Sequence, residues 1–167
     1  MRIIFIGAVE FSFETLKATI KAGGNVVGVI TLESSSFSAD FFDLSKFSKK
    51  KNIPYIYAKD INSDETKKWI KKMRPDIAFC FGWSRLIKKE VLKIPKKGIV
   101  GYHPAMLPKN RGRHPLIWAL ALGIKTTGST FFFMNNNADS GDILSQVSLN
   151  IKDDENARSL YDKITRI

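Results

Sequence analysis

The chain has 167 residues, of which 44% are hydrophobic and 26% are charged. This length and composition fit one compact domain of ordinary size with a sizeable core, and they exclude a disordered chain. Lys and Arg number 27 against 16 Asp and Glu, and the resulting formal charge of +11 favours anionic partners such as nucleotides, phosphates, polyglutamylated folate or RNA.

The first apolar stretch, residues 3–6, predicts a buried strand. It lacks the long core and cleavage site of a signal peptide, and no apolar run approaches the roughly 20 residues that cross a bilayer. We therefore expect a cytoplasmic protein without a membrane partner. The next residues, Gly7-Ala-Val-Glu10, hold one glycine where a dinucleotide fingerprint needs three, and the sequence has no phosphate loop ending in Gly-Lys-Ser/Thr. NAD and ATP sites are thus disfavoured.

Apolar runs rich in β-branched residues recur along the chain and alternate with segments of helical periodicity. One helical segment places Phe13, Leu16 and Ile20 on a stripe, and another begins near Asn62 and ends before Pro75. The predicted strands are residues 3–6, 26–31, 53–57, 77–81, 99–102 and 130–134. This alternation predicts an α/β, Rossmann-like fold, a mostly parallel twisted sheet with helices on both faces.

The cysteine and histidine content limits the chemistry. The single cysteine, Cys80, lies in an apolar run, so an intrachain disulfide is impossible and a role as core filler in a reducing compartment is expected. The two histidines, His103 and His114, belong to no Cys/His/carboxylate cluster with structural-zinc spacing. No metal is predicted.

The last segment, residues 153–167, has acids at its start and an apolar stripe of Leu160, Tyr161 and Ile164, which predicts a helix. That helix reaches the end of the chain with no capping residue after it. No internal repeat or composition shift marks a second domain. We expect a single domain, residues 1–167, and the uncapped end leaves open a truncation at the C-terminus.

His103 follows the predicted strand 99–102 and precedes Pro104, at a strand end where the chain must turn. An imidazole there can exchange protons near neutral pH, and a carboxylate at its other nitrogen would fix its tautomer. Asp139 lies in an Asn-, Asp- and Gly-rich loop after a second strand, a place where α/β proteins put chemistry. Taken alone, a histidine before a proline is more often structural than catalytic.

Two segments in register resemble the 10-formyltetrahydrofolate-dependent formyltransferases. They are Gly98-Ile-Val-Gly-Tyr-His-Pro-Ala-Met-Leu-Pro-Lys-Asn-Arg-Gly112 and Thr127-Gly-Ser-Thr-Phe-Phe-Phe-Met-Asn-Asn-Asn-Ala-Asp-Ser-Gly-Asp-Ile143. The family pattern is a strand ending in Asn-x-His-Pro, a Ser-Leu-Leu-Pro-like turn, and a Thr-Gly strand that leads to an Asp-x-Gly loop. The resemblance implies the formyltransferase catalytic-domain fold, 10-formyltetrahydrofolate as formyl donor, and a catalytic pair of His103 and Asp139.

The resemblance also implies the mechanism and a folate pocket. An acceptor amine attacks the formyl carbon, His103 manages the amine proton, and Asp139 orients His103 directly or through water. Residues 81–87 resemble the family's folate-pocket segment, with backbone groups near Arg85 and Ile87 facing the pteridine ring. For Leu86 the alternative is plain core packing. The implied folate-binding residues are Trp83, Arg85, Leu86, Ile87, Asn137 and Ala138.

Gly101 departs from the family pattern. It stands where the family has a catalytic Asn, two residues before the His, and losing such an oxyanion donor typically costs about 100- to 1,000-fold in rate. The substitutes considered are a backbone N–H freed by the glycine, a water in the vacated space, protonated His103, and the Ser84 hydroxyl. A second histidine common after the Thr-Gly strand is also absent, because Phe131-Phe132-Phe133 occupies that stretch.

Residues 110–119 most resemble the sugar N-formyltransferases, with a likeness to enzymes of pseudaminic-acid-type precursors. The implied acceptor is an amino sugar, nucleotide-linked or a nonulosonic-acid precursor, destined for surface glycans. Arg111, Arg113 and His114 would face its phosphate or carboxylate, since guanidinium forks match such anions. The alternative is that these three residues cap a helix that begins near Pro115 and contact solvent.

Two other functions stay open. Methionyl-tRNA formyltransferase is the first, but its basic loop and its second, β-rich domain are not found at the expected places, so nucleic acid is not the expected partner. The second is a folate- or sugar-binding relative that has lost catalysis, or a hydrolase that passes the formyl group to water. The oligomeric state is not fixed by the sequence, and a homo-oligomer is one option.

Overall fold

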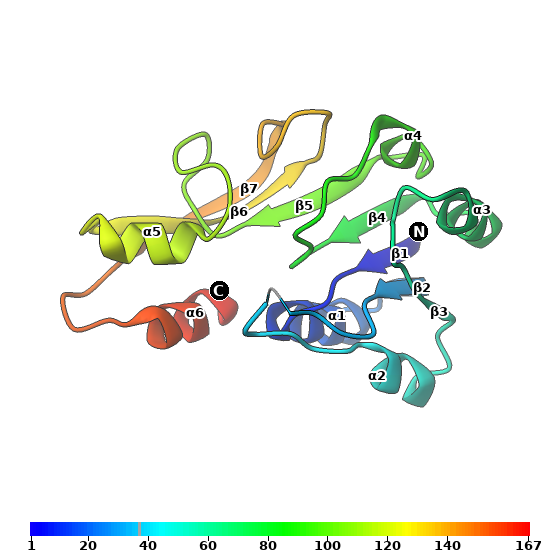
Figure 1. Ribbon diagram of the computed structural model, residues 1–167, viewed down its shortest axis with the longest axis horizontal. Coiled ribbons are helices and arrows are strands. Elements are labelled where there is room, and N and C mark those ends of the chain that lie inside the picture. The colour runs from blue at the N-terminus through cyan, green and yellow to red at the C-terminus, as the bar shows by residue number, and fades with distance from the viewer. Residues whose placement is uncertain (37) are drawn as a thin grey trace. The chain divides into compact units, whose positions relative to one another are not determined.

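The computed structural model describes residues 1–36 and 38–167, which divide into two compact units, Met1–Val100 and Gly101–Ile167. The division falls inside strand β5 (Ile99–His103). The strands form a seven-stranded sheet in the order β3-β2-β1-β4-β5-β6-β7 (Figure 1). The predicted α/β fold with a mostly parallel sheet is confirmed, whereas the single domain stays a prediction.

The first unit is built from parallel strands with helices between them. Its strands are β1 (Arg2–Ile6), β2 (Asn25–Thr31), β3 (Tyr55–Tyr57) and β4 (Ile77–Cys80), and its helices are α1 (Glu10–Lys21), α2 (Ser45–Lys50), α3 (Asp64–Met73) and α4 (Lys89–Leu92). Strand β1 pairs in parallel with β2 and β4, and β2 pairs in parallel with β3. Helices α1 and α2 lie on one side of these strands, and α3 and α4 lie on the other (Figure 1). Right-handed crossovers require this, because the chain reverses its direction across the sheet after β3.

Gly7 allows a close approach between α1 and the end of β4. A Cβ at position 7 would lie 2.5 Å from the carbonyl oxygen of Phe81 and equally close to the Ser12 side chain. The buried Ser12 hydroxyl donates to that same Phe81 oxygen at 2.5 Å. The one glycine after β1 therefore has a packing role, which agrees with the absence of a dinucleotide fingerprint.

Helix α3 follows its sequence signals closely. The Ser63 hydroxyl accepts the Thr66 amide at 3.2 Å and caps the first turn, which also carries Asp64 and Glu65. Its C-cap, Arg74, adopts a left-handed backbone with φ of 47° just before the proline. The predicted start near residue 62 and the stop before residue 75 are confirmed.

The second unit continues from β5 with α5 (Pro115–Ala121), β6 (Thr126–Phe133), β7 (Ile143–Asn150) and α6 (Ala157–Thr165). Strands β6 and β7 are antiparallel. The two helices share an apolar cluster made of Leu116, Ala119, Ile151, Leu160 and Ile164. The sequence does not predict β7, because its Ser, Gln and Asn side chains give little apolar signal and most of its residues are exposed. Pairing with β6 supplies its order.

In the part of the chain that the structure describes, no helix has the length and hydrophobicity needed to cross a membrane. The predicted core role of Cys80 is confirmed, since the residue is buried in β4. Burial raises the pKa of its thiol to about 12.

We expect Cys80 to be nearly inert in the folded protein, because so few of the molecules carry a thiolate and the sulfur is shielded. At pH 8, alkylation by iodoacetamide should be on the order of 1,000-fold slower in native protein than in urea-unfolded protein, followed by mass spectrometry. A native rate within about tenfold of the unfolded rate would contradict the burial of this thiol.

Candidate active site

His103 ends strand β5, and both of its ring nitrogens face oxygen atoms. The residue is 5% exposed, and its Nε2 lies 2.7 Å from the carbonyl oxygen of Asn110. Because a carbonyl oxygen only accepts, Nε2 carries the hydrogen and donates it. The other nitrogen, Nδ1, lies 3.6 Å from Oδ2 of Asp139. The structure thus brings together the predicted pair, and the catalytic roles of its two members stay predictions.

Asp139 lies in the loop between β6 and β7 and serves two neighbours. Its Oδ2 accepts the Gly112 amide at 2.9 Å while it also faces His103. The Asp139 backbone has a positive φ of 50°, a left-handed conformation that Asp tolerates better than most residues. A carboxylate held by a backbone N–H can keep the imidazole oriented and compensate a positive charge on it.

The polar residues around Asp139 hold its loop in shape. Asn135 Oδ1 accepts from the Asn137 amide at 2.9 Å and from the Ser140 hydroxyl at 2.8 Å. The Ser140 hydroxyl also lies 3.1 Å from the Asn137 carbonyl oxygen. Both backbone groups of Asn137 are therefore used inside the loop, so its exposed side chain is the part left for a folate ligand. Ala138, the other predicted folate residue in this loop, is exposed.

The turn after His103 is fixed by two residues that sequence reasoning did not identify. The Thr130 hydroxyl donates to the Ala105 carbonyl at 2.6 Å, and Gln146 Nε2 donates to the Leu107 carbonyl at 2.9 Å. Gln146 lies on the unpredicted β7 and has no sequence signal. Thr130 does have one, since a hydroxyl inside a buried apolar strand needs a partner.

The arginine-rich loop between β5 and α5 is bonded to both members of the pair. Asn110 contacts His103, and Gly112 contacts Asp139, so Arg111 lies between two attachment points. The residues predicted to bind substrate, Arg111, Arg113 and His114, are exposed. His114 occupies the N-cap position of α5, but its side chain makes no capping hydrogen bond. The alternative is therefore wrong in giving the His114 side chain a capping hydrogen bond, whereas its contact with solvent agrees with the exposure of all three residues.

The space beside Gly101 is filled by apolar atoms. A Cβ there would lie 2.8 Å from Cγ of Met134 and 3.0 Å from Cζ of Phe132. A water in a vacated Asn position, one of the substitutes considered, has no room in this arrangement. Phe132 belongs to the Phe-rich stretch that replaces the second histidine, so both departures from the family pattern meet at one point.

The predicted folate segment lies in the first unit and is fastened to the residues that precede α3. Asn62 donates to the Leu86 carbonyl at 2.9 Å and accepts the Lys88 amide at 2.7 Å. The Arg85 guanidinium donates to the Lys59 carbonyl. Leu86 is 63% exposed, so core packing is wrong for this side chain, whereas Ile87 is buried.

This segment has polar groups that suit a heterocyclic ligand. The indole Nε1 of Trp83 is buried without an acceptor among the described residues. No hydrogen bond from the described part of the chain reaches the backbone of Ile87. Buried polar groups normally find partners, and a pteridine ring has both donors and acceptors at its edge. With exposed Leu86 beside them, these residues fit the folate group of the expected donor.

A metal site finds no support in residues 1–36 and 38–167, which contain no group of three His, Cys, Asp or Glu able to hold an ion. The expected reaction needs none.

Comparisons with known proteins agree on one family. The formyl transferase profile matches residues 1–167. The chain is 38% identical to the bifunctional polymyxin resistance protein ArnA of Wigglesworthia glossinidia brevipalpis, over 98% of this chain and 25% of that protein. It is 32% identical to the methionyl-tRNA formyltransferase of Thermodesulfovibrio yellowstonii, over 98% of this chain and 54% of that one. The chain thus spans between a quarter and about half the length of these relatives.

Solved structures share the fold. The phosphoribosylglycinamide formyltransferase of Bacillus halodurans superposes with a TM-score of 0.86 at 22% identity, over 99% of this chain and 88% of that one. WlaRD, a sugar 3N-formyl transferase solved in the presence of dTdp and 5-N-Formyl-THF, gives a TM-score of 0.75 at 20% identity, over 99% of this chain and 58% of that one.

Any side chain at position 101 should destabilise the fold by crowding Met134 and Phe132. We expect Gly101→Ala to lower the free energy of unfolding by roughly 1–3 kcal/mol, the usual cost of overpacking. Phe132→Leu should relieve part of that cost, so the double variant should be more stable than the sum of the single effects predicts. Urea unfolding of the four proteins measures this coupling. Strictly additive effects would show that Phe132 does not fill the space beside position 101.

Proposed function

Because the chain belongs to the formyl transferase family, we propose that it transfers the formyl group of 10-formyltetrahydrofolate to the amine of an amino sugar. One observation carries the proposal. The loop that bears Arg111 is bonded to His103 through Asn110 and to Asp139 through Gly112. A proton-exchanging pair and an anion-binding side chain are therefore parts of one connected site.

The chemistry divides simply between donor and protein. The donor supplies an activated formyl carbon, which the acceptor amine attacks. His103 takes the amine proton as the tetrahedral intermediate forms and returns a proton to the leaving nitrogen, so that tetrahydrofolate is released. Asp139 compensates the charge that His103 acquires. In the described arrangement Nε2 donates to the Asn110 carbonyl, so we expect this carbonyl to move aside when the acceptor binds. The ring hydrogen must then reside on Nδ1, which faces Asp139, so that Nε2 is left unprotonated to take the amine proton.

Two features support an amino sugar as acceptor. Residues 110–119 resemble the sugar N-formyltransferases, and WlaRD, a sugar 3N-formyl transferase, shares the fold. Arg111 and Arg113 are exposed on the loop beside the catalytic pair, and guanidinium groups bind phosphate or carboxylate in a forked geometry. A nucleotide-linked amino sugar carries a diphosphate that fits this loop.

Methionyl-tRNA is the second candidate acceptor, supported by the 32% identity to a methionyl-tRNA formyltransferase. The charge distribution adds to this support, since the first unit carries nineteen Lys and Arg against ten Asp and Glu. Such an excess attracts RNA as readily as it attracts smaller anions.

The function is tested by mixing the protein with 10-formyltetrahydrofolate and a panel of free and nucleotide-linked amino sugars, methionyl-tRNA, or no acceptor. Tetrahydrofolate release, acceptor mass and free formate are followed together. We expect a formylated amino sugar, and we expect His103→Ala or Asp139→Asn to lower the rate about 100- to 10,000-fold.

Lys21→Ala, at the exposed end of α1, is the matched control and should keep the full rate. If methionyl-tRNA alone gains a formyl group, the acceptor is methionyl-tRNA and not an amino sugar. Formate without any formylated acceptor would show that the protein is a hydrolase. If no tetrahydrofolate is released at all, the proposal that the protein is an enzyme is wrong.

The loop arginines should act on acceptor binding. We expect Arg111→Ala or Arg113→Ala to raise KM for a phosphate-bearing acceptor about 10-fold with a smaller change in kcat, because the anion contact exists before and during the reaction. Lys109→Ala removes a neighbouring exposed charge and serves as the control. An equal rise in KM for Lys109→Ala would mean that only the general positive field matters.

A further inference from the structure

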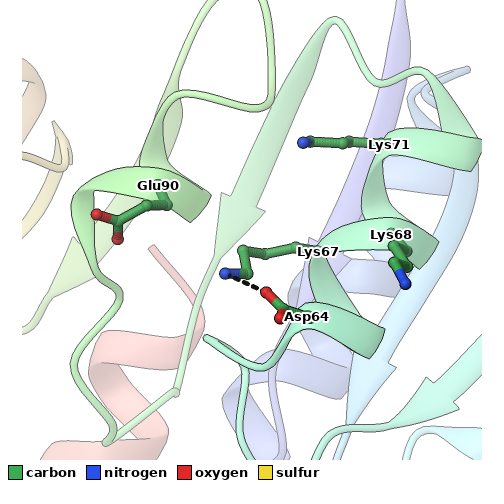
Figure 2. Close-up of a pocket in the computed structure, with 5 residues that line it drawn as sticks. All are labelled: Asp64, Lys67, Lys68, Lys71 and Glu90. Carbon is green, nitrogen blue, oxygen red and sulfur yellow. Dashed lines mark ion pairs between the residues drawn. The ribbon is translucent and has the colours of Figure 1, made fainter.

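The first unit carries a group of lysines that has no role in the proposed catalysis. A hollow of about 270 Å³ lies between α3 and α4 on the surface of this unit (Figure 2). It is lined by Asp64, Lys67, Lys68, Lys71 and Glu90. The lysines all come from α3, and Glu90 lies across the hollow from them on α4 (Figure 2).

The charges of the hollow leave two lysines available. Lys67 pairs with Asp64 at 2.7 Å, and this contact lowers the pKa of the Asp64 carboxyl. Lys68 and Lys71 are exposed, and neither forms an ion pair with any carboxylate in the described part of the chain. The two are three residues apart in a helix and therefore neighbours on its surface. Both also contribute to the lowered pKa of the Asp64 carboxyl, and the hollow holds three lysines against two carboxylates, a formal excess of one positive charge.

The hollow adjoins the predicted folate segment through hydrogen bonds. Asn62, just before α3, binds the Leu86 carbonyl and the Lys88 amide, and α4 begins at the next residue. Both walls of the hollow thus start from the point where this segment is fastened. Because a helix rises about 1.5 Å per residue, Lys68 lies only on the order of 6 Å along α3 from its first residue.

We propose that this hollow binds the γ-glutamyl tail of a polyglutamylated folate donor, with Lys68 and Lys71 contacting the tail carboxylates. The proposal rests on the folate donor of the proposed function and goes beyond it by assigning a site for the tail. A flexible chain with one carboxylate per unit can place each charge against a lysine and avoid Asp64 and Glu90. A nucleic acid backbone fits less well, since those two carboxylates would face its closely spaced phosphates.

Calorimetric binding of 10-formyltetrahydrofolate with one and with five γ-glutamates tests the proposal, because the ratio of the two Kd values isolates the tail. We expect the pentaglutamate form to bind about 10-fold more tightly, as two partly exposed ion pairs would allow. In the double variant Lys68→Gln/Lys71→Gln the ratio of the two Kd values should be close to one. In the parent protein, added salt should reduce the difference between the two Kd values.

Lys72→Gln is the matched control, since this exposed lysine is on the same helix but does not line the hollow. Circular dichroism confirms that each variant is folded. A ratio near one in the parent protein, a ratio retained in the double variant, or an equal loss in Lys72→Gln would each overturn the tail site. Failure of both folate forms to bind would overturn the donor assigned above and this site with it, whereas equal binding overturns the tail site alone.

Discussion

The site in the second unit depends on the two contacts that the Asp139 carboxylate makes. One oxygen faces His103 and also accepts the Gly112 amide, so it links the end of β5, the arginine loop and the β6–β7 loop. Two of these segments have further hydrogen bonds of their own, from Asn135 within the β6–β7 loop and from Thr130 to the turn after β5. A carboxylate with fixed partners holds an imidazole more precisely than a mobile one can.

The packing beside Gly101 shows how one substitution changes a site beyond its own atoms. The Phe132 ring and Cγ of Met134 lie within about 3 Å of where a Cβ at position 101 would be, so the place of a polar amide is taken by apolar groups. These two side chains offer no hydrogen-bond donor to an oxyanion, so its stabilisation would have to come from other groups around His103. Phe132 and Met134 can pack against β5 at this point because Gly101 has no side chain that would clash with them.

The positive charge of the chain is divided between distinct surfaces. Most of the excess belongs to the first unit, where Lys68 and Lys71 on α3 form no ion pair within the described part of the chain. The second unit places Arg111 and Arg113 on the loop that is bonded to His103 and Asp139. Lysine suits a flexible row of carboxylates, whereas arginine suits a phosphate in fixed orientation. The two chemistries agree with a donor and an acceptor that are both anionic.

The sequence by itself determined the alternation of strands and helices, the bounds of α3 and the placement of His103 and Asp139 at strand ends, because these follow from local periodicity and caps. Strand β7, the exposure of Leu86, the Asn110 contact to Nε2 and the filled space at Gly101 were decided only by the tertiary structure. Each of these features depends on a partner distant in the chain or on a backbone group. Backbone groups are chemically alike at nearly every residue, so the sequence does not indicate which of them makes a contact.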